Sequence, residues 1–246
     1  MKTIQNIRIL SGNMLKIIAA ITMTIDHIGA ILFPHILILR IIGRIAFPIF
    51  AFMIAEGCKY TKNKLRYLLF IMIAAFIFQV VYYAFTNDND MNIFVTFSLS
   101  IIMIYALQFF KVTLFNDIYK ISQKILAGFM FLLSIAFTYL INDFVEIHYG
   151  IFGCILPVFV ALFHKVNGNN PKFMDKIDNN LTSVLLTAIG LILLAFNSAS
   201  IQFYSLLSLI FLLLYSGKRG KYKMKYFFYI YYPAHMVILY GISLLL

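Results

Sequence analysis

The sequence predicts an all-α integral membrane protein, a polytopic bundle of about nine transmembrane helices. Of its 246 residues, 63% are hydrophobic and 12% are charged, whereas soluble domains average about 45–50% apolar and about 25% charged residues. Several apolar runs reach about 20 residues, the length that a helix needs to cross a hydrocarbon core of about 30 Å. The polar stretches between them are short, so we expect one integral-membrane domain over residues 1–246.

Nine apolar segments define the expected helices. They cover residues 15–34, 36–57, 65–86, 92–112, 122–141, 145–164, 181–196, 200–216 and 226–246. No small-x-small cleavage site follows the first segment, so we expect it to be retained rather than removed as a signal peptide. Pro48 lies in the middle of the second segment, where it frees a backbone carbonyl and kinks the helix. The seventh and eighth segments are short, and they either cross with little tilt or form one re-entrant pair.

The distribution of charge predicts the orientation of the chain. The net charge is +11, but the lysines and arginines gather in the loops between apolar runs, which indicates membrane topology rather than binding to nucleic acid. Basic and non-basic loops alternate along the chain, for example the basic loop at 59–66 and the acidic stretch at 86–90. Because basic loops stay in the cytoplasm, the N-terminus is predicted to be cytoplasmic and the C-terminus extracytoplasmic.

Ionisable residues interrupt three of the apolar segments. Asp26 and His27 lie about 17–18 Å into the first segment, Arg44 lies about 12 Å into the second with Arg40 one turn away, and His235 lies about 14 Å into the last. An unpaired charge at the bilayer centre costs about 2.5–3.5 kcal/mol on insertion scales. Each residue by itself could serve packing alone, but together they indicate a functional site, in which Asp26 and Arg44 are expected to pair.

These residues also carry a resemblance to a known family. The stretches LKIIAAITMTIDHIGAILFP, LRIIGRIAFPIFAFMIAEG, NIFVTFSLSI, HYGIFGCILP and FYIYYPAHMVILY resemble, in this order, segments of the TraX family over most of the chain. TraX-like proteins are associated with N-terminal acetylation of conjugative pilin. The opening is also similar to that of the heparan-α-glucosaminide N-acetyltransferases, in which a membrane-embedded histidine serves acyl transfer from cytosolic acetyl-CoA. His27 matches that histidine approximately, because the spacing between acid and histidine differs.

The resemblance implies a membrane-embedded acyltransferase that uses acetyl-CoA as its donor. Acyl transfer to an amine or hydroxyl needs a base, and a neutral imidazole suits pH 7. We expect His27 to be that base or an acyl carrier, with His235 as the second candidate, Asp26 to fix a tautomer, and Arg44 to stabilise the oxyanion or hold Asp26. The sequence contains Tyr231 and Tyr232 one turn from His235, where they could orient it.

The donor and the acceptor are expected on opposite sides of the membrane. Residues assigned to the donor are Arg40, Lys59, Tyr231 and Tyr232, and the basic ends that include Lys62, Lys64 and the loop GKRGKYKMK could attract the phosphates of CoA. The acceptor is an extracytoplasmic protein or glycan, such as a pilin N-terminus. No metal and no nucleic acid are expected, and homo-oligomers are left open. The expected location is the inner membrane of a bacterium.

A transporter or flippase is the alternative function. In that case the Asp, His and Arg side chains would form a proton relay or a substrate site at the midplane. Transporters are often built from two related halves with paired, broken helices. No such repeat is visible in the sequence, which favours the enzyme.

Overall fold

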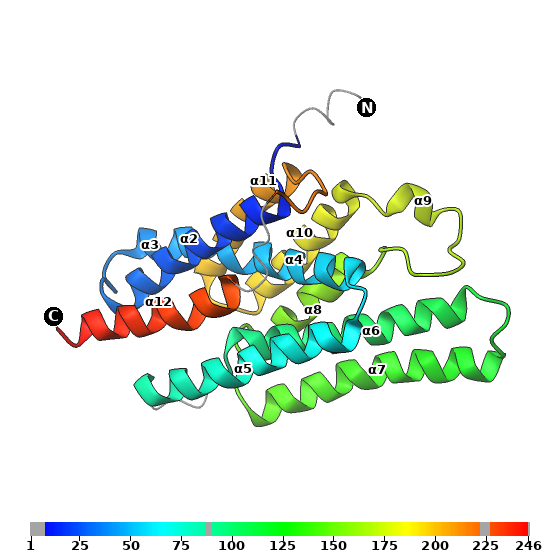
Figure 1. Ribbon diagram of the computed structural model, residues 1–246, viewed down its shortest axis with the longest axis horizontal. Helices are drawn as coiled ribbons and strands as arrows, with labels where there is room; N and C mark the ends of the chain where they lie inside the picture. The colour runs from blue at the N-terminus through cyan, green and yellow to red at the C-terminus, as the bar shows by residue number, and fades with distance from the viewer. Residues whose placement is uncertain (1–7, 87–89, 222–226, 246) are drawn as a thin grey trace.

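The computed structural model describes residues 8–86, 90–221 and 227–245, and these form a bundle of helices (Figure 1). The helices are α2 (Gly12–Ile31), α3 (Leu37–Gly43), α4 (Ala46–Tyr60), α5 (Lys64–Thr86), α6 (Ile93–Leu114), α7 (Ile121–Phe144), α8 (Gly150–Ala161), α9 (Met174–Ile177), α10 (Asn180–Phe196), the 3₁₀ helix η1 (Ser200–Leu207), α11 (Ser208–Leu213) and α12 (Phe227–Ser243). Helical segments therefore occupy each of the nine expected ranges.

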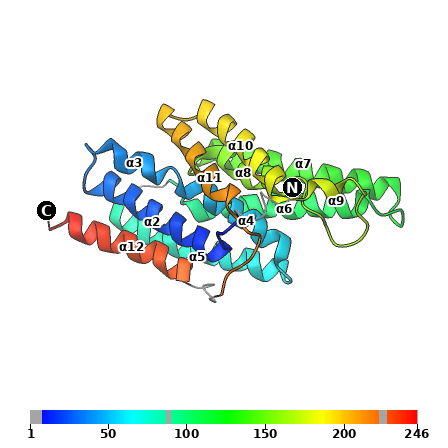
Figure 2. The ribbon, with the colours of Figure 1, turned by 90° about the horizontal axis from the view of Figure 1, so that it is seen from above.

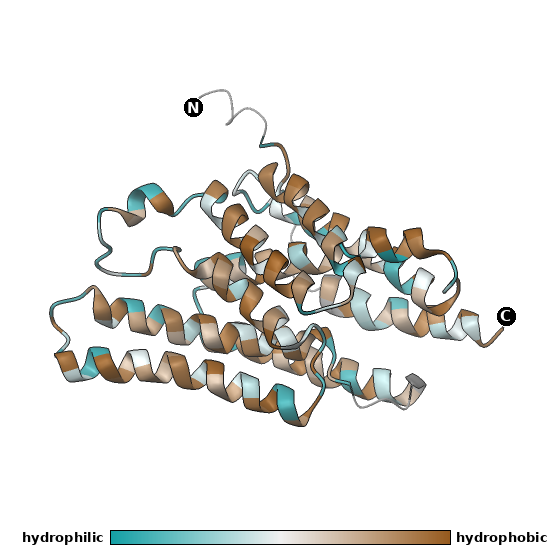
Figure 3. Ribbon diagram, turned by 180° about the vertical axis from the view of Figure 1, so that it is seen from behind, coloured by the Kyte–Doolittle hydropathy of each residue, from teal (hydrophilic) through white to brown (hydrophobic). Residues whose placement is uncertain are grey.

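Five helical segments of the described chain are long and apolar enough to cross a membrane. They are Gly12–Ile31, Leu37–Tyr60, Lys64–Ala84, Ile93–Leu114 and Ile121–Phe144. Hydrophobic residues dominate the outward-facing turns of the bundle, whereas the segment around α9 is hydrophilic (Figure 3). Exposed apolar side chains on α7, such as Phe129 and Leu133, fit a surface that lipid covers. A multi-pass helical membrane protein is therefore confirmed, while the count of nine spans and the orientation stay predictions.

The second expected helix is broken into two pieces. Proline at position 48 has no N–H to donate to the carbonyl of Arg44 four residues earlier, so the regular ladder cannot pass this point. The structure responds with a break at Arg44 and Ile45, between α3 and α4, and Pro48 takes its place in the first turn of α4, where proline is tolerated. The expected kink in mid-helix is thus corrected to a break that begins four residues before the proline.

Two other expected segments also differ from regular spanning helices. In the segment 145–164 the helix begins only at Gly150. The residue before it, Tyr149, has a left-handed φ of 65°, and Gly150 itself has φ 58°, so the right-handed helix does not continue back toward residue 145. The residues before them pair instead with the start of α6, where the Met91 N–H donates to the Glu146 carbonyl at 2.8 Å. The segment 200–216 begins with eight residues of 3₁₀ helix before α11.

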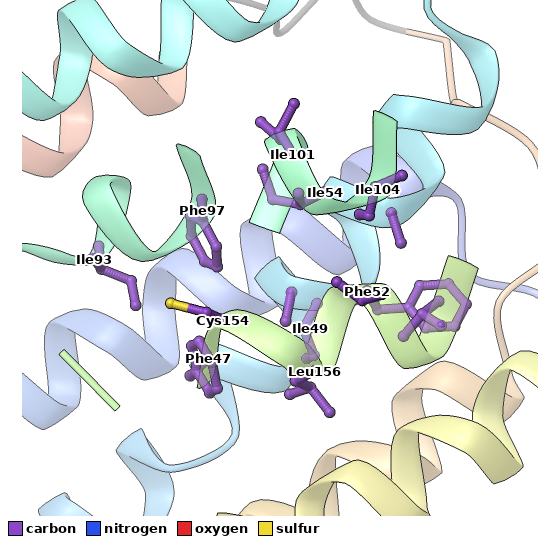
Figure 4. Packing of buried hydrophobic residues seen from close by; sticks show 14 of the residues in the cluster. Phe47, Ile49, Phe52, Ile54, Ile93, Phe97, Ile101, Ile104, Cys154 and Leu156 are labelled. Carbon is purple, nitrogen blue, oxygen red and sulfur yellow. The ribbon is translucent and has the colours of Figure 1, made fainter. Parts of the chain in front are cut away.

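Helix α4 forms the centre of the bundle. Its buried residues Phe47, Ile49 and Phe52 lie between Phe97 and Ile101 of α6 on one side and α8 on the other (Figure 4). Helices α6 and α8 pack on each other as well as on α4. Helix α2 packs against α3 and α4, and α12 lies along α2 with its Met236 in the same core (Figure 2). The bundle thereby brings the first and the last described helices side by side.

Contacts between loops join the basic ends of the helices. The Lys59 ammonium at the end of α4 bonds the Asp178 carboxylate at 2.6 Å, just before α10. Burial by itself would raise the pKa of the Asp178 carboxyl, but the hydrogen bonds from Lys59 and from the Lys165 N–H lower that pKa below its ordinary value. This end of the bundle is the one predicted to face the cytoplasm.

Candidate functional site

A cavity of about 790 Å³ runs along α2 for most of its length. Gly12 and Ala30, both on its wall, are 18 positions apart, which corresponds to about 27 Å of helix. The wall near Gly12 belongs to the predicted cytoplasmic end and contains Lys16, Glu56 and Arg219. Apolar side chains line the middle, and ionisable residues line the other half, so one cavity connects the basic end to the intramembrane polar residues.

Two arginines hold Asp26 in the half of the cavity that lies away from the basic end, which is called the inner half below. The Arg44 Nη2 contacts both Asp26 carboxylate oxygens at 2.9 Å, and Arg40 Nη1 lies 3.0 Å from Oδ2. Arg44 also donates to Gln202 of η1 at 3.4 Å, and it is only 9% exposed. The structure thus contains the Asp26–Arg44 pair that the two depths suggest. Two cations against one anion leave a net positive charge beside the cavity.

Asp26 can reach the two arginines because the backbones of α2 and α3 lie close together. A Cβ at Gly43, the last residue of α3, would overlap the side chain of Asp26, and a Cβ at Gly29 of α2 would lie 2.7 Å from the Leu39 Cβ. Small residues allow helix backbones to approach in this way. Glycine at these two positions is therefore required by the packing of α2 on α3, not by backbone conformation.

Gly43→Ala is expected to displace Asp26 from its arginines and to destabilise the fold. Overpacking of this kind typically costs about 1–3 kcal/mol. The matched control is Gly241→Ala in α12, where the added Cβ meets no atom within 4 Å and a gain of up to about 1 kcal/mol is expected from helix propensity. Thermal unfolding in detergent measures both effects. Equal melting temperatures for the two variants would contradict the tight α2–α3 contact.

His27 and His235 form a hydrogen bond between α2 and α12. The His27 Nδ1 lies 2.7 Å from the His235 Nε2, and the His235 Nδ1 lies 3.0 Å from the Tyr231 carbonyl. A carbonyl only accepts, so the neutral His235 carries its proton on Nδ1 and accepts at Nε2. His27 then donates from Nδ1, and its Nε2 keeps a free lone pair.

The free Nε2 gives His27 and His235 different roles. His27 lines the cavity, and the side-chain hydrogen bond that it makes within the described part of the chain is the one from Nδ1 to His235. His235 is buried behind it, 6% exposed. Of the two histidines, His27 therefore faces the cavity, and His235 is bonded to it from the other side. The structure gives the task of fixing the tautomer to His235 rather than to Asp26, whose carboxylate is occupied by the two arginines.

A second contact fixes α12 on α2. The Tyr231 hydroxyl lies 2.6 Å from the Thr24 hydroxyl, and Thr24 already donates to the Ala20 carbonyl at 2.9 Å, so Tyr231 is the donor. The Tyr231 ring also stacks on the His235 ring with centroids 5.3 Å apart, and Tyr232 meets His27 edge-on. Both tyrosines line the cavity. Both tyrosines contact the His235 ring, which their spacing along the sequence indicates, and Tyr232 contacts His27 as well.

The structure adds His148 and Tyr149 to the site. Both line the cavity, and the Tyr149 ring stacks on Phe47 with centroids 3.9 Å apart. Tyr149 is the one described residue other than glycine with positive φ, and strained backbone of this kind gathers at functional sites. In the sequence His148 lies at the boundary of an apolar segment, where solvation alone explains it. The hydrogen bonds of residues 146–148 with Met91, just before α6, direct His148 towards the cavity.

Lys59 and Arg40 do not share one binding site in the structure. Lys59 is absent from the described wall of the cavity and is engaged by Asp178. Arg40 is part of the wall, but it is bound to Asp26 in the inner half. Of the four residues assigned to the donor, Arg40, Tyr231 and Tyr232 therefore face the cavity, all in its inner half. A group that binds the donor at the basic end of the cavity must therefore come from residues other than these four.

Fold and site together define a multi-pass helical membrane protein with a histidine and an arginine-bound carboxylate on the wall of one cavity. The model of the family described as TraX protein matches residues 11–243. The chain therefore belongs to the TraX family.

Two curated relatives extend this result. The chain is 26% identical to the probable fimbrial assembly protein FimC, serogroup H1, of Dichelobacter nodosus, over 93% of this chain and 94% of that protein. It is 40% identical to an uncharacterized protein of Rickettsia prowazekii, but over 77 residues, so it spans 31% of the length of that relative. No solved structure matches the chain.

Proposed function

We propose that the protein transfers an acetyl group from acetyl-CoA to an amine or hydroxyl of an extracytoplasmic acceptor. One observation carries the proposal: His27, whose Nδ1 is bonded to His235, lines a cavity that reaches the basic end of the bundle near Gly12, about 22 Å away along α2. A donor that enters at the basic end can thus reach a base that lies deep in the membrane. Membership of the TraX family and the fimbrial relative support a pilin N-terminus as the acceptor.

The His27 Nε2 acts as the general base in this mechanism. It takes the proton of the acceptor as the amine or hydroxyl attacks the thioester carbon, and a tetrahedral intermediate forms. The imidazolium keeps its hydrogen bond from Nδ1 to His235, which stabilises the new charge. The intermediate then collapses, the C–S bond breaks, and the CoA thiolate takes the proton from Nε2. The products are the acetylated acceptor and CoA, and His27 returns to its neutral form.

The two arginines supply the electrostatic part of the mechanism. Arg40 and Arg44 together carry one more positive charge than Asp26 balances, and both line the cavity beside His27. An oxyanion that develops in a water-poor site is stabilised strongly by cations that are already fixed in place. The Asp26 carboxylate provides this fixation.

The transporter is a second candidate, because the cavity has wall residues near both ends of α2. A proton-coupled transporter would use His27, His235 and Asp26 as a relay. In the structure the Asp26 carboxylate is locked by two arginines rather than bonded to an imidazole. The enzyme accounts for that arrangement better, since fixed cations serve an oxyanion.

Radiolabelled acetyl-CoA tests the proposed function directly. The protein in lipid nanodiscs is expected to release free CoA in the presence of a peptide with the N-terminus of pilin, and to transfer the label to that peptide. A peptide with a blocked amine is the control and should remain unlabelled. Proton-coupled uptake in liposomes without any release of CoA would instead establish the transporter and overturn the acetyltransferase.

A further inference from the structure

Two cations stand at the mouth of the cavity, far from the proposed base. Lys16 of α2 and Arg219 of the loop after α11 both belong to the wall near Gly12. Within residues 8–86, 90–221 and 227–245, no acidic side chain forms an ion pair with either of them. The Lys16 ammonium instead lies 5.9 Å from the centroid of the Phe228 ring. Positive-inside topology explains basic residues at this end, but it does not require them to line a cavity.

The acidic residue that the described cavity wall contains at this end is already engaged. Glu56 also belongs to the wall, but its carboxylate accepts a hydrogen bond from the Tyr215 hydroxyl at 3.0 Å and lies 3.8 Å from the His164 Nε2. Among the described residues of the wall, Lys16 and Arg219 are therefore the cations left to meet a ligand at this end of the cavity. Two adjacent cations without a bound acid favour an anionic ligand with more than one charge.

Backbone hydrogen bonds fix the loop that carries Arg219. The N–H groups of Gly12 and Asn13 donate to the carbonyls of Lys218 and Arg219 at 2.8 and 3.0 Å. The turn also needs glycine at 220, where φ is 100° and a Cβ would lie 2.8 Å from the Ser11 Oγ. Because the start of α2 is held against this loop, the backbone of Arg219 lies against Asn13, one helical turn before Lys16.

We propose that Lys16 and Arg219 bind the diphosphate of CoA. This inference rests on the proposed acetyl transfer. From Lys16 to His27 there are 11 helical positions, about 16 Å. The arm of CoA from the diphosphate oxygen to the sulfur has twelve bonds, equivalent to four extended residues or about 14 Å. With the diphosphate at the mouth, the extended arm therefore brings the thioester to the Nε2 of His27, through the apolar middle of the cavity.

Charge removal at the mouth tests this assignment. Equilibrium binding of CoA and of pantetheine, which lacks the phosphates, is measured in nanodiscs for the wild type and for Lys16→Gln and Arg219→Gln. Each substitution is expected to weaken CoA binding by roughly 10–100-fold and to leave pantetheine binding unchanged, which also shows that the variant is folded. The matched control is Lys172→Gln, an exposed cation of the loop before α9 that does not line the cavity.

The outcomes separate the two proposals. Selective loss of CoA affinity in both mouth variants, with Lys172→Gln at the wild-type value, supports the diphosphate site. If the wild type binds CoA and transfers acetyl while both variants bind CoA as tightly, the diphosphate site is wrong and the enzyme stands. If the wild type binds neither CoA nor acetyl-CoA, the proposed function fails, and the diphosphate site fails with it.

Discussion

Replacing His27 with glutamine is expected to lower acetyl transfer by roughly 10²–10⁴-fold, the usual contribution of a general base. Glutamine has a similar length and keeps an amide N–H that can donate to the His235 Nε2, so the link between α2 and α12 survives. It lacks a basic nitrogen at the place of Nε2. We therefore expect turnover of acetyl-CoA to fall while binding of CoA and the melting temperature stay close to the wild type.

The control for this variant is His35→Gln. His35 lies exposed in the connection between α2 and α3, outside the cavity wall. Its replacement removes one imidazole from the protein and should leave turnover unchanged. Full activity of His27→Gln would remove His27 from the mechanism. A loss of both activity and thermal stability would instead assign the His27–His235 pair to packing.

Asp26→Asn is expected to destabilise the protein by about 3–5 kcal/mol, because it leaves Arg44 buried without its counter-charge. Asparagine keeps the size of the side chain but removes the charge that both arginines meet. For a chain of this length a loss of this size lowers the melting temperature by on the order of 10 °C. Thermal unfolding in detergent measures the change.

A second substitution identifies the cause of this loss. Asp26→Asn combined with Arg44→Met removes both buried charges, and we expect most of the stability to return, as for other buried ion pairs that are replaced together. Acetyl transfer should stay low in the double variant, because the fixed cation is gone. Asp117→Asn, in the exposed loop after α6, controls for the loss of one negative charge. If Asp26→Asn melts at the wild-type temperature, the ion pair with Asp26 does not offset the cost of burying the Arg44 charge.

The sequence by itself determined the class of protein and the depth of its polar residues. Apolar runs of about 20 residues can only be satisfied in lipid as helices, so composition and length fix the helical bundle. The rise of 1.5 Å per residue then gives Asp26, His27, Arg44 and His235 similar depths. The high cost of lone charges in lipid made a contact between Asp26 and Arg44 a sound expectation. The acetyl-CoA chemistry came from resemblance to a family rather than from these rules.

Only the tertiary structure decided which atoms meet. Depth along a helix says nothing about rotation around its axis, so the sequence could not show that Asp26 faces Arg40 and Arg44 while His27, the next residue, faces His235. It equally could not direct His148 inwards or place Lys16 beside Arg219, because loop pairing between distant segments sets both positions. Helix propensity is local and can be read along the chain, whereas hydrogen bonds between helices depend on packing, and packing is settled by all the helices together.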